Sequence, residues 1–416
     1  MTTPVLLDPI SGRPLVQVSR QVLSDGDSRW PVLDGIAYLR TGLAGPSRAV
    51  ELRQAALAAI DAGDERTALA LLLTDQDSHA PLPAPSTATT LAVVDAVRAQ
   101  QATLRGAMRA LNFGPVADYF AHRTSTPTFL SGLALLAHAG RPPGAVVEMA
   151  CGIGHFLREL SAHGVPALGV DLVFAKLWLA RRFVAADSML VCADASHVPF
   201  VCPPATTVFC HDAFYFFADK AQSAQCWMQL AGDGGSVLVG HAHSALVAQS
   251  VAGSPLTPAG YAALLPGCAM FDDAELTTSA LACERAPRRS IDALGAADAV
   301  AMVWHGSPQE PLQVPLEGSQ CGSQDGSHDA WWPAILQPPA ATPLRLNPLL
   351  GLRNGCADPQ WPSPRFAAEY APQAGYLGGP MPSPQLIARA AHGMHDDVEI
   401  AALARRRVLV DVPERW

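Results

Sequence analysis

The chain is predicted to adopt an α/β fold in which helices cover both faces of a mostly parallel sheet. Apolar stretches of strand length alternate with helical patterns between Ala145 and Ala248, and this alternation is typical of a parallel sheet. Hydrophobic residues make up 49% of the 416 residues, which is enough to form a large core. A chain of this length exceeds a typical single domain, so we expect one central catalytic domain with additions at both ends.

Composition and spacing divide the chain into four predicted regions. Short apolar runs between turn signals predict a small β module at the start, and helical spacing predicts a linker region after it. After about residue 310 the chain is rich in glycine, proline and serine, and residues 315–330 are predicted to be disordered. Helical patterns return around Leu386–Ala391 and Val398–Arg405. The predicted boundaries are 1–42 for the β module, 43–112 for the helical linker, 113–310 for the central domain and 311–416 for a partly irregular C-terminal extension.

The overall composition favours a cytoplasmic protein without a membrane partner. The sequence has no apolar run of membrane-spanning length, and its start lacks the features of a signal peptide. Its nine cysteines are an odd number without a C-x-x-C pair, so we expect buried reduced thiols rather than disulfides. The net charge is −9 and the only lysines are Lys176 and Lys220, so a nucleic-acid partner is not favoured.

The strongest motif is a strand that runs into two glycines and then into a helix. The strand ends before Cys151-Gly-Ile-Gly154, and the helix follows directly. Glycines at such a turn let the backbone approach a ligand closely, while the helix start presents free N–H groups. A dinucleotide fingerprint would continue with a small residue at position 157, but this chain has Leu157 there. The motif therefore predicts a nucleotide-type pocket that does not suit NAD or FAD.

At this motif the chain resembles the class I methyltransferases that use S-adenosylmethionine (SAM), of the type 11 and type 25 groups. Their first motif, acidic-x-x-x-G-x-G, corresponds to Glu148, Gly152 and Gly154. The later motifs follow in order at Leu168–Asp171, Leu190–Phe200, Thr207–Phe217 and Gly234–His243. The resemblance implies a Rossmann-like seven-stranded, mostly parallel sheet and SAM as the cofactor.

The resemblance also implies which residues bind the cofactor. Asp171 would accept hydrogen bonds from the ribose hydroxyls, and Asp194 would meet the adenine amino group. Taken singly, the glycines could form an ordinary tight turn and Asp171 could be a helix cap. Five matches in the expected order are much more specific than any one of them. The implied cofactor-binding residues are Glu148, Ala150, Gly152, Gly154, Asp171, Asp194, Ala195 and His211.

The first residues are similar to the small zinc-ribbon domain that precedes some rRNA methyltransferases and activates others as a separate protein. The first cysteine pair of that family would fall at Asp8 and Ser11. Neither residue is a thiol, so we expect a module without zinc that stabilises the fold or contacts a partner.

Candidate catalytic residues follow the fourth and fifth predicted strands, where open α/β sheets place their ligands. We expect His211, His241 and Asp212 to be catalytic, with one of the histidines acting as a base. They could instead only line the pocket. A third interpretation joins His211, Asp212, His241 and His243 in a metal site, although the primary prediction includes no metal.

Three flanking segments are weaker candidates. His155 could approach the methionine part of SAM, or it could be a surface residue on the first helix turn. Tyr119, Phe120, His122 and Arg123 lie in the helix before the central domain, which either covers the pocket or only packs against it. The aromatic segment Trp361–Tyr370 could pack in a core or cover the substrate.

The predicted activity is methyl transfer from SAM to a small molecule. This prediction rests on the cofactor motifs, on the aromatic and histidine side chains near the pocket, and on the missing basic stripe. RNA or protein methylation is one alternative, suggested only by the first module. A non-catalytic SAM-binding scaffold is another. The sequence does not identify the acceptor or the oligomeric state.

Overall fold

The computed structural model describes most of the chain, namely residues 4–42, 48–76, 80, 82–247, 253–306, 326–339, 341–353, 356–394 and 397–416. Most of the segment predicted to be disordered, and Cys321 with it, lies outside these ranges. The eight described cysteines are all unpaired. Cys356 is exposed, so the prediction that the thiols are buried is wrong at this position. It begins β16 (Cys356–Pro359), the middle strand of a small three-stranded sheet in the extension.

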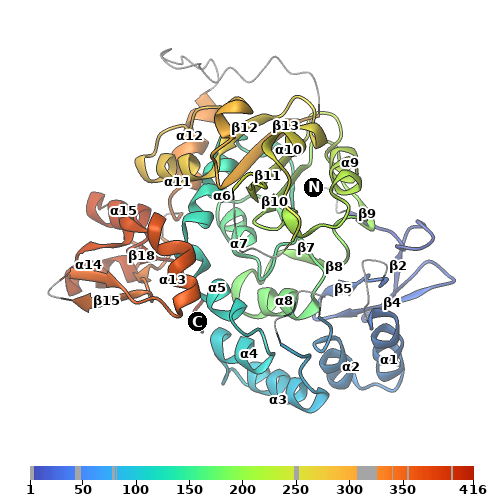
Figure 1. Cartoon of the computed structure of the whole chain (residues 1–416). Coiled ribbons are helices and arrows are strands. Elements are labelled where there is room, and N and C mark those ends of the chain that lie inside the picture. The colour runs from blue at the N-terminus through green and yellow to red at the C-terminus, as the bar shows by residue number, and fades with distance from the viewer. Residues whose placement is uncertain are drawn as a thin grey trace.

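Seven strands form the central sheet that the sequence predicts (Figure 1). The strands β6, β7, β8, β10 and β11 pair in parallel with their neighbours in this set, and β13 runs antiparallel to both β11 and β12. In spatial order the strands are β12 (Ala269–Asp272), β13 (Ala299–His305), β11 (Ser236–His243), β10 (Thr207–His211), β6 (Val146–Met149), β7 (Ala167–Asp171) and β8 (Met189–Cys192). The α/β, Rossmann-like fold class is thereby confirmed.

Helices cover both faces of this sheet because successive residues of each strand point to opposite sides. Val208 packs in the cluster that contains Trp227, and its neighbour Phe209 packs in the cluster that contains Phe129. The first face is covered by α9 (Lys220–Ala231) and α10 (Pro258–Leu264), and the second by α6 (Pro127–His138), α7 (His155–Ala162) and α11 (Asp273–Ala282). The strand ends that carry the sequence motifs are therefore held on a rigid base.

The first strands of the chain extend the central sheet. The strand β5 (Ile36–Tyr38) pairs in parallel with β8 and begins an antiparallel run that makes the sheet eleven-stranded. The run continues through β4 (Arg29–Leu33), β3 (Val22–Ser24) and β2 (Val16–Ser19). Separately, β1 (Val5–Leu6) pairs with β9 (Phe200–Val201) in a two-stranded sheet. The predicted β module is thus joined to the central sheet by backbone hydrogen bonds.

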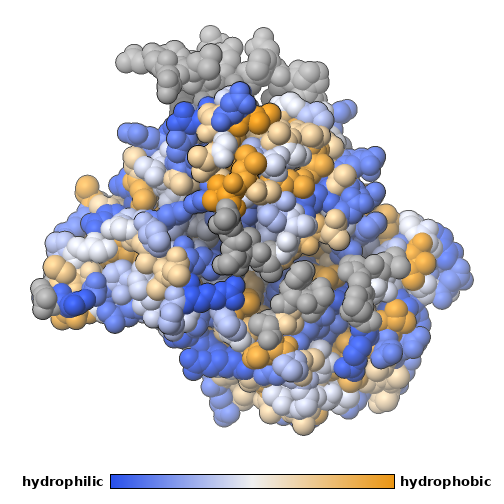
Figure 2. Space-filling model, in the orientation of Figure 1, coloured by the Kyte–Doolittle hydropathy of each residue, from blue (hydrophilic) through white to orange (hydrophobic). Residues whose placement is uncertain are grey.

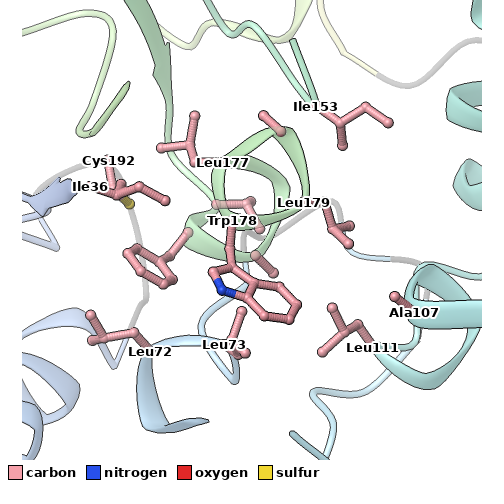
Figure 3. Close-up of a cluster of buried hydrophobic side chains, with 14 of the residues drawn as sticks. Ile36, Leu72, Leu73, Ala107, Leu111, Ile153, Leu177, Trp178, Leu179 and Cys192 are labelled. Atoms are coloured by element: carbon pink, nitrogen blue, oxygen red, sulfur yellow. The ribbon is translucent and has the colours of Figure 1, made fainter. Parts of the chain in front are cut away.

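Ahead of α6, five helices of the described chain follow the first strands in sequence. They are α1 (Ala49–Asp61), α2 (Glu65–Leu72), α3 (Thr87–Arg98), α4 (Leu104–Ala110) and α5 (Val116–His122). Figure 3 shows side chains from the ends of α2 and α4, Leu73 and Leu111 among them, around Trp178 of α8 (Phe174–Leu179). The Trp178 indole N–H donates to the Asp34 carboxylate at 2.7 Å, so even the polar atom of this large buried side chain is satisfied.

The C-terminal extension has a core of its own and docks beside α5 and α6 (Figure 1). The Trp416 indole donates to the Ala121 carbonyl at 2.6 Å, and the Arg158 guanidinium pairs with Asp411 at 2.7 Å. Its elements are α12 (Gly326–Ile335), β14 (Arg345–Leu346), β15 (Leu350–Arg353), β16 (Cys356–Pro359), α13 (Pro364–Tyr370), β17 (Gly379–Pro380), α14 (Pro384–Ala391), α15 (Val398–Arg405) and β18 (Leu409–Val410).

The molecular surface on the face drawn in Figure 2 mixes hydrophilic residues with scattered hydrophobic patches. Among the described residues, no helix combines the length and the apolar character that crossing a membrane would require.

Candidate active site

A cavity of about 1060 Å³ lies at the carboxyl ends of β6, β7, β8 and β10. Helix α5 forms one wall and α13 of the C-terminal extension forms another. Predicted site residues that line it are Glu148, Ala150, Gly152, His155, Asp171, Asp194, Ala195, His211 and Asp212. Residues far apart in sequence thus surround one space.

The glycine turn takes a backbone shape that few other residues tolerate. Gly152 has φ of +57°, and a Cβ built there would lie 2.7 Å from Cε1 of Phe120. Gly154 has φ of +82° and precedes the first residue of α7. Ala150, which carries a side chain, also has positive φ at +55°. Such strained positions gather at functional sites, and here they bring backbone to the cavity wall.

Asp171 fixes the glycine turn to the end of β7. One carboxylate oxygen accepts the Gly152 N–H at 2.9 Å, and the other accepts the Val173 N–H at 2.9 Å. Lys176 approaches at 3.5 Å. A carboxylate offers about four acceptor positions, so capacity remains for hydroxyl donors in the cavity.

Three other predicted cofactor residues have defined surroundings. Glu148 is buried, and burial raises the pKa of its carboxyl well above the usual range. Its Oε2 has no hydrogen-bond partner within the described structure. Asp194 accepts the Ser196 N–H at 2.9 Å, and the Ala195 carbonyl accepts the Trp227 indole N–H at 2.8 Å. The loop after β8 is thereby held against the cavity.

Asp212, at the cavity wall, is held by two tyrosine hydroxyls and an arginine. Its Oδ2 accepts the Tyr119 hydroxyl at 2.9 Å and lies 3.2 Å from the Arg123 guanidinium, while its Oδ1 accepts the Tyr215 hydroxyl at 2.9 Å. Burial alone would raise its pKa, but the positive charges of His241 and Arg123 outweigh burial and lower the pKa to about 2. Asp212 is therefore a carboxylate anion at neutral pH, held in place by α5.

His211 is placed as a neutral structural ring beside the cavity. Its Nε2–H donates to the Thr128 carbonyl at 2.6 Å, since a carbonyl can only accept. Its Nδ1 is buried and packs against Gly240, which has no Cβ to obstruct it. Burial, helped by Arg123, lowers its pKa to about 3. The role of a catalytic base is not favoured, because the remaining nitrogen faces backbone rather than the cavity.

His241 lies behind Asp212 and does not line the cavity. Its Nδ1–H donates to Asp273 Oδ2 at 2.7 Å, and its Nε2 lies 4.0 Å from Asp212 Oδ1. Burial lowers the pKa, but Asp273 and Asp212 outweigh it and raise the pKa to about 9. A protonated imidazole has no lone pair to accept a proton, so this arrangement does not favour His241 as the base.

The helix before the central domain and the extension both reach the cavity. Tyr119, Phe120 and Arg123 line it, whereas His122 packs on Phe366 and Trp416 instead. From the extension come Ser363, Arg365, Phe366, Glu369 and Tyr370.

Sequence reasoning named Tyr370 only as the end of an aromatic segment, and it did not single out Asp273. The Tyr370 hydroxyl is buried and has no hydrogen-bond partner within the described structure. Asp273 contacts His241 across a separation of 32 residues, at the start of α11. No local pattern signals such a pair, because the contact depends on how the sheet is ordered.

The central region of the chain resembles a known protein family. Residues 147–239 match the sequence profile of a family described as "Methyltransferase domain". Among curated proteins, none matches the chain.

Solved structures share limited likeness with the chain. A Thermotoga maritima SAM-dependent methyltransferase is 16% identical over 45% of this chain and 92% of its own, with a TM-score of 0.32. In a complex between the Haloferax volcanii Trm112 methyltransferase activator and a methyltransferase, the matching chain is 21% identical over 35% of this chain and 71% of its own, with a TM-score of 0.29. PKMT2 of Rickettsia typhi, in complex with S-adenosylhomocysteine, is 17% identical over 29% of this chain and 26% of its own, with a TM-score of 0.24.

Proposed function

We propose that the molecule to which this chain transfers a methyl group is a small molecule. The chain is an enzyme whose central region is a class I SAM-dependent methyltransferase domain. The observation that carries the proposal is that one cavity joins the glycine turn and Asp171 to a second polar group around Asp212. The first group suits a cofactor and the second suits an acceptor.

The cofactor half would use the strand ends of β6, β7 and β8. Asp171 would receive the ribose hydroxyls while keeping its bond to the Gly152 N–H. Asp194, held by the Ser196 N–H, would receive the adenine amino group. Glu148, with an unpartnered buried oxygen, is available to the methionine part. These assignments follow the family's motif positions and the lining of the cavity.

The acceptor half would lie between Asp212 and α13. Ligand pockets measure roughly 300–1,000 Å³, so a cavity of about 1060 Å³ has room for the cofactor and a small second molecule. Its walls here carry aromatic rings from Tyr119, Tyr215 and Phe366, and α13 of the extension forms one side. Aromatic walls around a cavity of this size suit a small acceptor better than a large RNA or a folded protein.

The chemistry requires few protein groups. Bound SAM would supply the methyl group: the acceptor's lone pair would form the new bond to it in line as the C–S bond breaks, S-adenosylhomocysteine would leave as a neutral sulfide, and a proton carried by the acceptor atom would pass to water. Positioning supplies much of the rate of such a reaction. The fixed Asp212 carboxylate would orient an O–H or N–H of the acceptor, and Tyr119 and Tyr215 would hold that carboxylate in place.

The test is SAM-dependent turnover. Production of S-adenosylhomocysteine should be measured with panels of phenols, amines and carboxylic acids, and with bulk RNA at low and high salt. We expect turnover with one class of small molecule, and loss of most of it in Asp212→Asn with SAM affinity retained. Turnover on RNA alone that persists in high salt would overturn the small-molecule assignment. Tight SAM binding without turnover on any cell extract would identify a scaffold.

A further inference from the structure

A cluster of two histidines and a carboxylate lies at the back of the cavity wall. Asp212 follows β10, and His241 and His243 are two residues apart on β11. One ring nitrogen of each histidine and one oxygen of Asp212 all lie within 4.8 Å of one another. The side chains of His241 and Asp212 are largely buried, with exposed fractions of 15% and 8%.

The backbone brings these three groups together through an irregularity in β11. The register between β11 and β13 shifts between Val239 and Ala242, and His241 takes positive φ at +47°. Asp212, directly after the neighbouring strand β10, also has positive φ at +58°. Bulges of this kind re-aim side chains next to functional sites, and the two strained residues are the ones that face each other.

The distances leave room for an ion between the groups. His241 Nε2 and Asp212 Oδ1 are 4.0 Å apart, which is too long for a hydrogen bond. Two bonds of about 2.1 Å to one ion span at most about 4.2 Å. The ring centroids of His241 and His243 are 4.9 Å apart, and the angle between the two ring planes is 71°. Two imidazoles bound to one ion at about 100° to each other would have centroids roughly 4.9 Å apart, given nitrogen–metal bonds of about 2.1 Å.

The surroundings resemble those of metal-bound histidines. A ligating histidine usually donates its other N–H to a carboxylate, which fixes the ring. His241 does so to Asp273 at 2.7 Å. Asp212 is likewise held by Tyr119 and Tyr215. The Nδ1 of His243 is buried and has no hydrogen-bond partner in the described part of the chain. A buried ring nitrogen without a partner is unfavourable, and a bond to an ion would satisfy it.

We propose that Asp212, His241 and His243 bind one divalent transition-metal ion, with Asp273 as the residue that positions His241. Two imidazoles and one carboxylate suit zinc, manganese or iron(II), and three protein ligands leave positions open.

The use of this ion rests on the proposed function. Asp212 also lines the cavity, so open positions of the ion would be close to the acceptor. A metal ion binds a hydroxyl or carbonyl oxygen and lowers the pKa of a bound hydroxyl. The acceptor class would then be a molecule with an oxygen that the ion can hold, such as a phenol or a hydroxy acid.

Metal binding can be tested without any knowledge of the acceptor. The full chain should be stripped with EDTA and titrated with Zn²⁺ and with Mn²⁺ by calorimetry in the absence of SAM. We expect one ion per chain, an affinity at least about 100-fold lower in His243→Gln, and about 10- to 100-fold lower in Asp273→Asn. His392→Gln, which changes an exposed histidine directly after α14, is the matched control and should bind like wild type.

Cobalt(II) provides a readout that does not depend on a variant that folds. Added to the stripped wild-type protein, it should give absorption bands of a nitrogen-ligated ion rather than those of the hydrated ion. Only hydrated-ion bands, no stoichiometric heat, or equal binding by a folded His243→Gln would overturn the proposal. SAM turnover that persists in the stripped protein would refute only the ion's role in the reaction, and absence of SAM binding would refute only the proposed function.

Discussion

Replacing Asp171 with alanine is expected to weaken SAM binding strongly while leaving the chain folded. In the proposed complex the carboxylate accepts two ribose hydroxyls, and hydrogen bonds to charged groups contribute about 1.5–3 kcal/mol each. Their loss therefore costs about 3–6 kcal/mol, or roughly 10²- to 10⁴-fold in affinity. The change also removes the acceptor for the Gly152 N–H, which loosens the glycine turn in the same direction.

Calorimetric titration of SAM into the purified variant measures this effect, with circular dichroism to verify folding. The matched control is Asp187→Ala, an exposed aspartate in the segment between α8 and β8, which should bind SAM like wild type. A folded Asp171→Ala protein whose affinity falls less than about tenfold, a difference of about 1.4 kcal/mol, would refute this account of Asp171.

Three further predictions concern the glycine turn, the first module and a buried histidine. Gly152→Ala places a Cβ 2.7 Å from Phe120 at positive φ, so we expect lower stability by about 2–4 kcal/mol and impaired SAM binding; unchanged thermal unfolding would contradict this. Asp8→Ala removes the acceptor of the Trp30 indole and of two backbone N–H groups, so it should cost about 2–4 kcal/mol in urea unfolding, whereas the exposed Asp27→Ala should cost little and chelators should have no effect on this module. Burial lowers the pKa of His138 from 6.5 to about 3. Between these two pH values the imidazole is protonated in the unfolded chain but neutral in the folded chain. The folded state therefore has its full stability with respect to His138 above pH 6.5 and loses stability as the pH falls toward 3. His138→Gln should make the unfolding free energy less steep in that range by up to about 1.4 kcal/mol per pH unit, and an unchanged slope would contradict the prediction.

The sequence predicts the central sheet well because its signals are local. Each strand that ends in a motif is a short apolar run, and the glycine turn shows its own need for positive φ. Parallel strands place their carboxyl ends at one edge, so Asp171, Asp194 and Asp212 could be expected on the same side. The structure has them all on the cavity wall.

Contacts between distant segments could not be predicted in this way. The pairing of β5 with β8 joins the first module to the sheet, yet no residue in either strand signals that partner. The His241–Asp273 bond likewise depends on the position of α11 beside β11. The sequence also contains no sign of the two carboxylates beside His241, which raise the pKa of its imidazole.

The extension illustrates a different limit. Its high content of proline and glycine predicts irregular chain, but Phe366, Tyr370 and Leu377 share a core with α14 and α15. Hydrophobic burial holds this region together even though its regular elements are short. Its position over the cavity follows from docking contacts such as the Tyr376 hydroxyl on the Ser125 carbonyl at 2.9 Å.

The most direct test of the central claim is calorimetric binding of SAM, S-adenosylhomocysteine and NAD to the wild-type protein. The account predicts that one molecule of SAM or S-adenosylhomocysteine binds per chain, in competition with each other, and that NAD does not bind. Binding of NAD alone, or of none of the three, would contradict the assignment of the cavity as a SAM site.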